Sequence, residues 1–211
     1  MDTTISLKTY LNELSSNSPT PGVGNVSALC GVLACSLGMM VCSLTIGKKK
    51  YTEVENDIKD LLNKLETAKN DFLKLAEEDN QVFNRVMEAF KLPKETDEEK
   101  KSRSKKIDAA TFEAAVVPSR VIEKCRLTIP FIQTIAEKGN QNSLSDAGVA
   151  AALFRTASDG AFLNVMINCT SLLNKVIGSE LLKKSEVAND EVKMLSERIS
   201  VLIKSKLNPV S

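Results

Sequence analysis

The sequence of 211 residues contains no histidine and no tryptophan. Histidine is the side chain that most often acts as a general base near neutral pH, and it is the commonest metal ligand in proteins. Its absence argues against a histidine-based catalytic triad and against the usual zinc sites. Any chemistry must therefore use carboxylates, amides, amines, hydroxyls, thiols or backbone groups, and we expect no metal.

Other features are scarce as well. No stretch has the alternating pattern of a β-strand, and no segment repeats. The 28 basic and 27 acidic residues leave a net charge of only +1, too little for a field that attracts nucleic acid. The five cysteines include no CxxC pair and lie in apolar segments, which favours reduced thiols in a protein core. We therefore predict a cytoplasmic protein that binds no nucleic acid.

Residues 26–47 form an uncharged apolar stretch that runs directly into Lys48, Lys49 and Lys50. A membrane-spanning helix needs about 20 such residues, so the length suits a span, and the lysines resemble a cytoplasmic flank. Small and weakly polar residues are frequent in it, however, and no second candidate span exists. These features favour the buried helix of a helical protein that has no membrane partner, with the membrane anchor as the alternative.

Every long segment shows helical spacing of its apolar residues. The clearest case covers residues 54–86, where apolar residues alternate steps of three and four positions and only Asp79 interrupts the seam. Pro118 fits the first turn of a new helix. The sequence predicts one all-α domain over residues 1–211, a bundle of about seven or eight helices. Two helices rich in small residues, one near each end of the chain, are expected at its buried centre.

Three polar residues occupy apolar contexts on predicted helices. Asp79 is either a structural group, which forms a seam salt bridge or fixes helix register, or a carboxylate held in a cleft with its pKa adjusted for proton transfer. Asn164 and Asn168 lie four positions apart and so share one helix face. Two amides on an apolar face need partners, which are either other helices or a flat heterocyclic ligand.

Three further features lie at predicted turns. Gly22 and Gly24 precede the apolar helix, where they form an ordinary turn or let the backbone approach an anion. Asp146 lies where a helix begins, so helix capping is its simplest explanation. Lys48 and Lys50 are either a solvated run or a site for an acidic ligand.

Four stretches, in this order, resemble one known family. They are PTPGVGN at 19–25, LTIGKKKY at 44–51, the segment from DNQVF at 79–83 to the LPK at 92–94, and GNQNSLSDAGVA at 139–150 continued by GAFLNVMIN at 160–168. Together they are similar to the cyclodeaminase/methenyltetrahydrofolate cyclohydrolase family, which includes the C-terminal domain of formiminotransferase-cyclodeaminases and stand-alone bacterial enzymes. The family turn usually reads PGGGS, and this chain has Val23 in place of the middle glycine and Asn25 in place of the serine.

The resemblance implies an all-helical homodimer that holds a reduced, polyglutamylated folate near the subunit interface. It implies Asp79 and Asp146 as the acid/base and charge-stabilising pair, without saying which does which. Asn142, Asn164 and Asn168 would bind the pterin, Gly22 and Gly24 would let the backbone approach it, and Lys48 and Lys50 would meet the glutamate tail.

Two activities fit these residues. A cyclodeaminase converts 5-formimino-tetrahydrofolate to 5,10-methenyl-tetrahydrofolate and ammonia, and this is the activity we expect first. The alternative is a cyclohydrolase that opens 5,10-methenyl-tetrahydrofolate to 10-formyl-tetrahydrofolate. A second alternative is a non-enzymatic helical interaction module, in which the buried polar groups only fix helix register.

Overall fold

A computed structural model describes residues 4–208, which form six α-helices and two short 3-10 helices without any β-strand. The all-α prediction is confirmed. The elements are α1 (Leu7–Leu14), α2 (Val23–Thr45), η1 (Lys49–Val54), α3 (Glu55–Phe90), α4 (Asp97–Lys138), η2 (Gln141–Ser143), α5 (Leu144–Ser171) and α6 (Lys175–Leu207).

Fewer α-helices form than the predicted seven or eight, because Pro118 does not begin a new helix. It lies inside α4, which continues unbroken from Asp97 to Lys138. A proline inside a helix leaves the carbonyl four residues earlier without its N–H donor. Here that carbonyl belongs to Ala114, and it accepts a hydrogen bond of 3.1 Å from Nδ2 of Asn168 on α5. A distant side chain thus replaces the missing helical bond.

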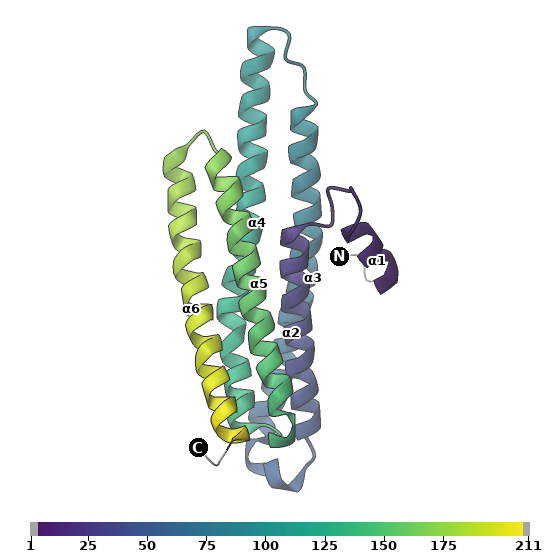
Figure 1. Ribbon diagram of the computed structural model, residues 1–211, viewed down its shortest axis with the longest axis vertical. Coiled ribbons are helices and arrows are strands. Elements are labelled where there is room, and N and C mark those ends of the chain that lie inside the picture. Colours follow the sequence, from purple (N-terminus) through teal and green to yellow (C-terminus); the bar gives the residue numbers. More distant parts are fainter. Residues whose placement is uncertain (1–3, 209–211) are drawn as a thin grey trace.

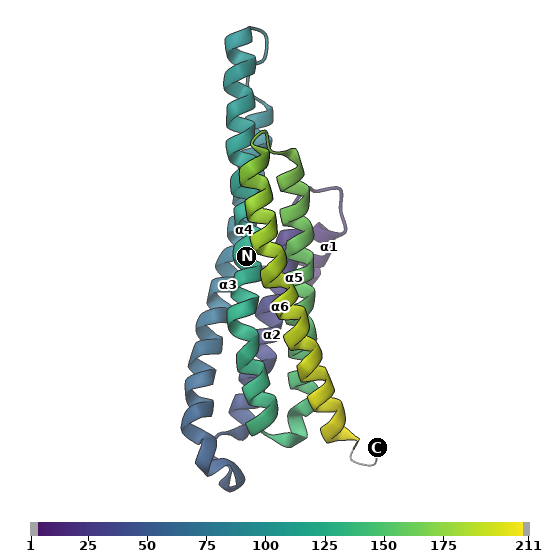
Figure 2. The same ribbon diagram turned by 90° about the vertical axis from the view of Figure 1, so that its left-hand side faces the viewer.

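Helices α2 to α6 run alternately up and down, side by side, and their core is shared (Figures 1 and 2). The α3–α4 hairpin extends beyond the ends of α5 and α6, and the short helix α1 stands beside the bundle. Because direction alternates, the start of α2, the last third of α3, the middle of α4 and the end of α5 lie at similar height. Segments far apart in sequence therefore meet there.

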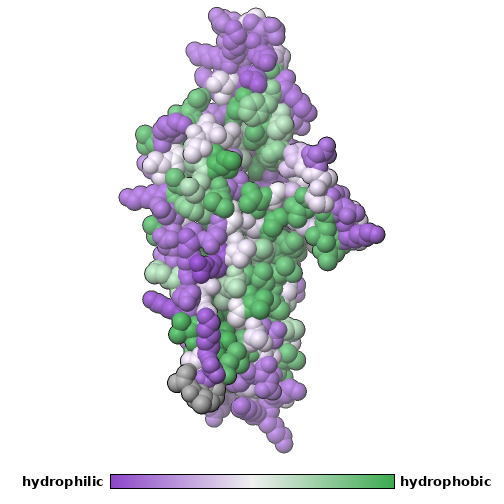
Figure 3. Space-filling view, viewed as in Figure 1, coloured by the Kyte–Doolittle hydropathy of each residue, from purple (hydrophilic) through white to green (hydrophobic). Residues whose placement is uncertain are grey.

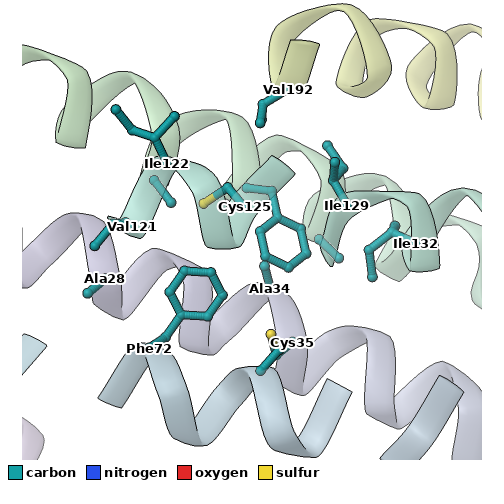
Figure 4. Close-up of a cluster of buried hydrophobic side chains, with 14 of the residues drawn as sticks. Ala28, Ala34, Cys35, Phe72, Val121, Ile122, Cys125, Ile129, Ile132 and Val192 are labelled. Carbon is teal, nitrogen blue, oxygen red and sulfur yellow. The ribbon is translucent and has the colours of Figure 1, made fainter. Parts of the chain in front are cut away.

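The core is built from aliphatic, aromatic and thiol side chains. Figure 4 shows Phe72 of α3 and Cys35 of α2 pointing into the same space as Cys125 of α4. The rings of Phe72 and Phe154 pack with their centroids 6.0 Å apart. All five cysteines are free, as predicted, and four of them are buried.

Helix α2 is long and apolar enough to cross a bilayer, and within the described chain it alone passes that test. Its small residues, such as Ala28, Gly31, Ala34 and Gly38, are buried within the bundle, as in the core helix of a globular protein. The opposite face is not covered. The two small-residue helices α2 and α5 pack against each other. Because one face of α2 is uncovered, the prediction that both helices lie at a buried centre is not confirmed.

Candidate functional site

A cavity of about 350 Å³ opens at the level where four helices and one turn meet. The turn before α2 and helices α2, α3, α4 and α5 all contribute to it. Its lining residues are Pro19, Thr20, Gly22, Val23, Gly24, Asp79, Val82, Phe83, Val86, Ala114, Asn164, Ile167, Asn168 and Ser171. The lining is mainly apolar with one carboxylate and two amides, which is the usual character of a small-molecule site, and the volume suits a ring system rather than a long ligand.

Asp79 faces this cavity and has no cationic partner among the ion pairs of residues 4–208. It lies against the beginning of α2, where its carboxylate accepts the backbone N–H of Asn25 and, at 3.3 Å, Nδ2 of Asn164. Burial raises the pKa of the Asp79 carboxyl, and these two hydrogen bonds oppose that rise. A seam salt bridge therefore does not form within residues 4–208, while a polar group that fixes helix register and a carboxylate held in a cleft both agree with the geometry.

The glycine at position 24 makes this approach possible. A Cβ there would lie 1.9 Å from Oδ1 of Asp79 and 2.6 Å from Nδ2 of Asn164, so only glycine leaves room for both groups. Gly22 is the N-cap of α2 and offers no side-chain cap. The open N–H groups of the first turn are thus available to Asp79, and the helix dipole favours its charged form.

The sequence-predicted amides also meet at the cavity. Nδ2 of Asn168 donates to Oδ1 of Asn164 at 3.0 Å, and Asn164 in turn donates to Asp79. The prediction that Asn164 and Asn168 share a face is confirmed. Part of their hydrogen-bonding capacity is used within the protein, since Nδ2 of Asn168 also serves the Ala114 carbonyl.

The other predicted site residues lie at the opposite end of the bundle. Lys48, Lys50 and Asn142 are exposed, and Asp146 is half-buried in the first turn of α5. Hydrogen bonds hold their two loops together: Asn140 N–H donates to Thr45 Oγ1 at 2.9 Å, Asn140 Nδ2 donates to the Leu44 carbonyl at 3.0 Å, and Gln141 N–H donates to Tyr51 Oη at 3.1 Å. This second group, called the lower cluster below, consists of Lys48, Lys50, Asn142 and Asp146.

One chain therefore does not bring the predicted carboxylate pair together. Asp146 precedes Asn164 on α5 by 18 residues, which at about 1.5 Å per residue corresponds to about 27 Å. Asn164 contacts Asp79, so Asp79 and Asp146 are separated by a similar distance. Within one protomer the two carboxylates do not share a site, because α5 runs away from the cavity toward its own beginning, and their pairing stays a prediction.

A family model described as formiminotransferase-cyclodeaminase matches residues 6–187, most of the chain. The chain belongs to this family. The family expectation drawn from the four sequence stretches is thereby confirmed.

Relatives in the family match most of the chain. A methenyltetrahydrofolate cyclohydrolase of Methylorubrum extorquens is 42% identical over 96% of this chain and 97% of that protein. A formimidoyltransferase-cyclodeaminase of Mus musculus is 31% identical over 81% of this chain, which spans only 32% of that longer protein. The crystal structure of a formiminotetrahydrofolate cyclodeaminase from Thermotoga maritima matches with a TM-score of 0.86 at 27% identity, covering 97% of this chain and 98% of that one.

Two residues beside the cavity have roles that the sequence analysis did not predict. Asn25 lies inside α2, which begins at Val23, and is buried between helices. Its side chain accepts from Tyr10 Oη of α1 at 2.9 Å and donates to the Ala76 carbonyl of α3 at 3.0 Å. The second residue is Pro118, which the sequence predicts as a helix start. Its place on the apolar face was the available signal for a position inside a helix, but the residue that replaces its missing N–H lies on another helix.

No group of three or more histidine, cysteine, aspartate or glutamate side chains that could hold a metal ion occurs within residues 4–208. A second hollow between α3 and α4 is lined by charged residues. Its Lys124 and Asp71 form an ion pair of 2.8 Å, and Arg120 pairs with Glu78. The charges there are already paired, so the cavity at Asp79 remains the candidate site.

Proposed function

We propose that this chain is a folate one-carbon enzyme, a cyclohydrolase that adds water to 5,10-methenyl-tetrahydrofolate and gives 10-formyl-tetrahydrofolate. The observation that carries the proposal is Asp79, a carboxylate of raised pKa that faces a mainly apolar cavity without a cationic partner. The relative at 42% identity, named as a methenyltetrahydrofolate cyclohydrolase, supports this activity over the cyclodeaminase that the sequence placed first.

The chemistry suits a carboxylate. The methenyl carbon bridges N5 and N10 within a delocalised cation, and an anion in a water-poor cavity stabilises that charge. Water attack produces a tetrahedral centre, and opening it requires protons to move between oxygen and nitrogen. A carboxyl group whose pKa is raised above its ordinary value holds and releases a proton nearer to the pH of the reaction than an unperturbed one does. Asp79 can therefore serve in a protein that has no histidine.

The pterin ring fits the remaining lining. Asn164 and Asn168 present amide groups at the cavity, and amides match the alternating donors and acceptors of a pterin edge. Gly22 keeps a side chain away from the mouth, so that the ring can approach the backbone, while the space beside Gly24 admits Asp79 and Asn164. The cavity is too small for a whole folate, so we place the glutamate tail outside it.

A second candidate activity is cyclodeamination of 5-formimino-tetrahydrofolate. The fold neighbour from Thermotoga maritima, named as a formiminotetrahydrofolate cyclodeaminase, favours it. The methenyl cation is the product of this reaction and the substrate of the hydrolysis, so the same cavity serves either. The relatives compared above are named as enzymes, which counts against a non-enzymatic interaction module.

One assay separates these activities. The methenyl group absorbs light, so its loss from 5,10-methenyl-tetrahydrofolate reports hydrolysis, and its appearance from 5-formimino-tetrahydrofolate reports cyclodeamination. We expect the purified protein to accelerate the first reaction. Acceleration of the second reaction alone would show that the protein is a cyclodeaminase and not a cyclohydrolase. If neither folate is turned over and calorimetry detects no folate binding, the non-enzymatic interaction module is the remaining function.

The uncovered face of α2 supports a homodimer. Val23, Val26, Cys30, Leu33, Leu37, Met40 and Leu44 follow each other at steps of three and four residues. Four of them, Val23, Leu33, Met40 and Leu44, are at least 40% exposed, and α5 adds exposed Val149, Leu163 and Ile167. Figure 3 shows hydrophobic surface along this side of the bundle. A stripe with this spacing is what a partner helix packs against.

A two-fold dimer through this face explains the split site. In such a dimer the same surface of both subunits is used. If two α2 helices pack antiparallel, the Leu44 end of one subunit lies beside the Val23 end of the other. The lower cluster of the partner subunit, including Lys48 and Asp146, then lies near the cavity at Asp79. Each of two sites would combine both carboxylates, with Lys48 and Lys50 placed for the polyglutamate tail.

Hybrid dimers test this arrangement. Asp79→Asn and Asp146→Asn subunits carrying different tags are co-expressed, and the doubly tagged dimer is purified. We expect each parental variant to be inactive and the hybrid to recover about half of the wild-type activity, since one of its two sites is then intact. A hybrid as inactive as both parents would contradict a shared site, and a protein that remains monomeric would contradict the dimer.

The remaining expectations stay predictions. We propose that no metal takes part in the reaction, since Asp79 and the amides can supply the acid, base and electrostatic roles. A dialysis against a strong chelator should leave activity unchanged. The cytoplasmic location is likewise proposed, and cell fractionation tests it together with the membrane anchor.

A further inference from the structure

Pro118 affects the cavity through a chain of hydrogen bonds. It is buried inside α4 and has no N–H for the carbonyl of Ala114. Buried carbonyls that lose a helical donor need another one. Nδ2 of Asn168 supplies it from α5 at 3.1 Å, across 54 positions of sequence.

Two backbone carbonyls set the orientation of the Asn168 amide. Nδ2 of Asn168 donates to the Ala114 carbonyl and, at 2.9 Å, to the backbone carbonyl of Asn164. Both carbonyls only accept, so together they turn Nδ2 toward them. The same Nδ2 donates to Oδ1 of Asn164 at 3.0 Å. An amide has one accepting and one donating end, so Asn164 is left with Nδ2 facing Asp79, 3.3 Å from Oδ1 of that carboxylate.

We propose that Pro118 is a positioning residue for the site: it frees the Ala114 carbonyl, which orients Asn168 and Asn164, and these hold the hydrogen bond that Asn164 donates to Asp79. The inference rests on the proposed role of Asp79 in the folate reaction. Pro118 does not line the cavity, and any apolar side chain could fill its place in the core. Only the missing N–H of proline gives it this role.

Few other groups influence Asp79. The turn at 15–22, helix α2 and residues 160–171 of α5 contain no charged residue. On α3, Glu77 is exposed and accepts a hydrogen bond from Nε2 of Gln81. Four further charged residues of α3 and α4 line a different hollow and pair with one another: Glu78, Arg85, Glu113 and Arg120. The ionisation of Asp79 therefore depends on burial and on the bonds from Asn25 and Asn164.

The test is Pro118→Ala. Alanine restores an N–H that competes for the Ala114 carbonyl, and alanine is a far better helix former than proline, so the variant should fold. Released from that carbonyl, Asn168 keeps only its bonds to Asn164 and is free to turn with it, so the bond from Asn164 to Asp79 weakens. We expect kcat to fall about tenfold, the scale of one hydrogen bond to a charged group. The KM should change little, and the limb of the pH profile governed by Asp79 should move to higher pH.

Pro130→Ala is the matched control. Pro130 lies in the same helix but is exposed, so the same substitution should leave kcat and the pH profile at wild-type values. The double variant of Pro118→Ala and Asn168→Ala should be no slower than the slower single variant, because both changes remove the same interaction. A wild-type pH profile in Pro118→Ala, or fully additive losses in the double variant, would overturn the proposal.

A carboxyl-carbon NMR titration makes the result independent of catalysis. The Asp79 signal, assigned with Asp79→Asn, should titrate at higher pH in Pro118→Ala than in the wild-type protein and Pro130→Ala. If neither folate is turned over, the proposed function fails while this titration still decides the positioning role. An unchanged titration with full activity would reject the positioning role alone.

Discussion

Replacement of Gly24 by alanine is the sharpest test of the cavity. The added Cβ would lie 1.9 Å from Oδ1 of Asp79 and 2.6 Å from Nδ2 of Asn164. Non-bonded heavy atoms settle near about 3.5 Å, so the carboxylate must retreat by roughly 1.6 Å. Misplacement of a reacting group by about 1 Å can cost a factor of about 100 in rate. We therefore expect kcat/KM to fall at least about 100-fold.

The same substitution should leave the fold intact. Alanine is favoured over glycine in a helix by up to about 1 kcal/mol, whereas local overpacking costs about 1–3 kcal/mol. The net loss of about 0–2 kcal/mol corresponds to a fall in Tm of at most about 8 °C for a chain of this size. Activity is therefore lost from a folded protein, which distinguishes damage to the site from unfolding.

The assay follows methenyl absorbance, with Tm measured by circular dichroism on the same samples. Gly148→Ala is the control, because its Cβ meets only the end of the flexible Ile203 side chain, at 3.3 Å. The control should keep wild-type kcat/KM. A Gly24→Ala protein with near wild-type kcat/KM would refute the reasoning, since Asp79 could then not depend on its close approach to the start of α2.

Four further outcomes are expected. Asp79→Asn should lose at least about 100-fold in kcat. Burial raises the pKa of Asp79 in the folded protein, so its charged form opposes folding, and the variant should melt no lower than wild type at pH 7. Any gain in Tm should shrink as the pH falls through that raised pKa. Lys48→Ala should raise KM for polyglutamylated substrate more than for a substrate without the tail, and equal effects would exclude a tail contact. Leu33→Arg should shift the protein from dimer to monomer in analytical ultracentrifugation and reduce turnover with it, because a charge would be buried at the proposed interface. Burial raises the pKa of Cys35 to about 12 and of Cys42 to about 11, so iodoacetamide at pH 8 should modify neither in the native protein and both after unfolding, as read by mass spectrometry.

Local sequence patterns were sufficient for much of this protein. The three-and-four spacing of residues 54–86 predicted one long helix and singled out Asp79 as the member that does not belong in a core. The spacing of Asn164 and Asn168 placed both amides on one face. Such inferences hold because helical periodicity depends on residues within a few positions of each other.

Packing between distant segments decided the rest. The sequence predicted a helix start at Pro118, but a side chain 54 positions away supplies the missing bond to Ala114, so α4 continues. Asp79 and Asp146 looked like partners in one site, yet the direction of α5 places them at opposite ends of one chain. Periodicity fixes which face of a helix is apolar, whereas the height at which helices meet, and hence which polar groups share a cavity, follows only from their packing in three dimensions.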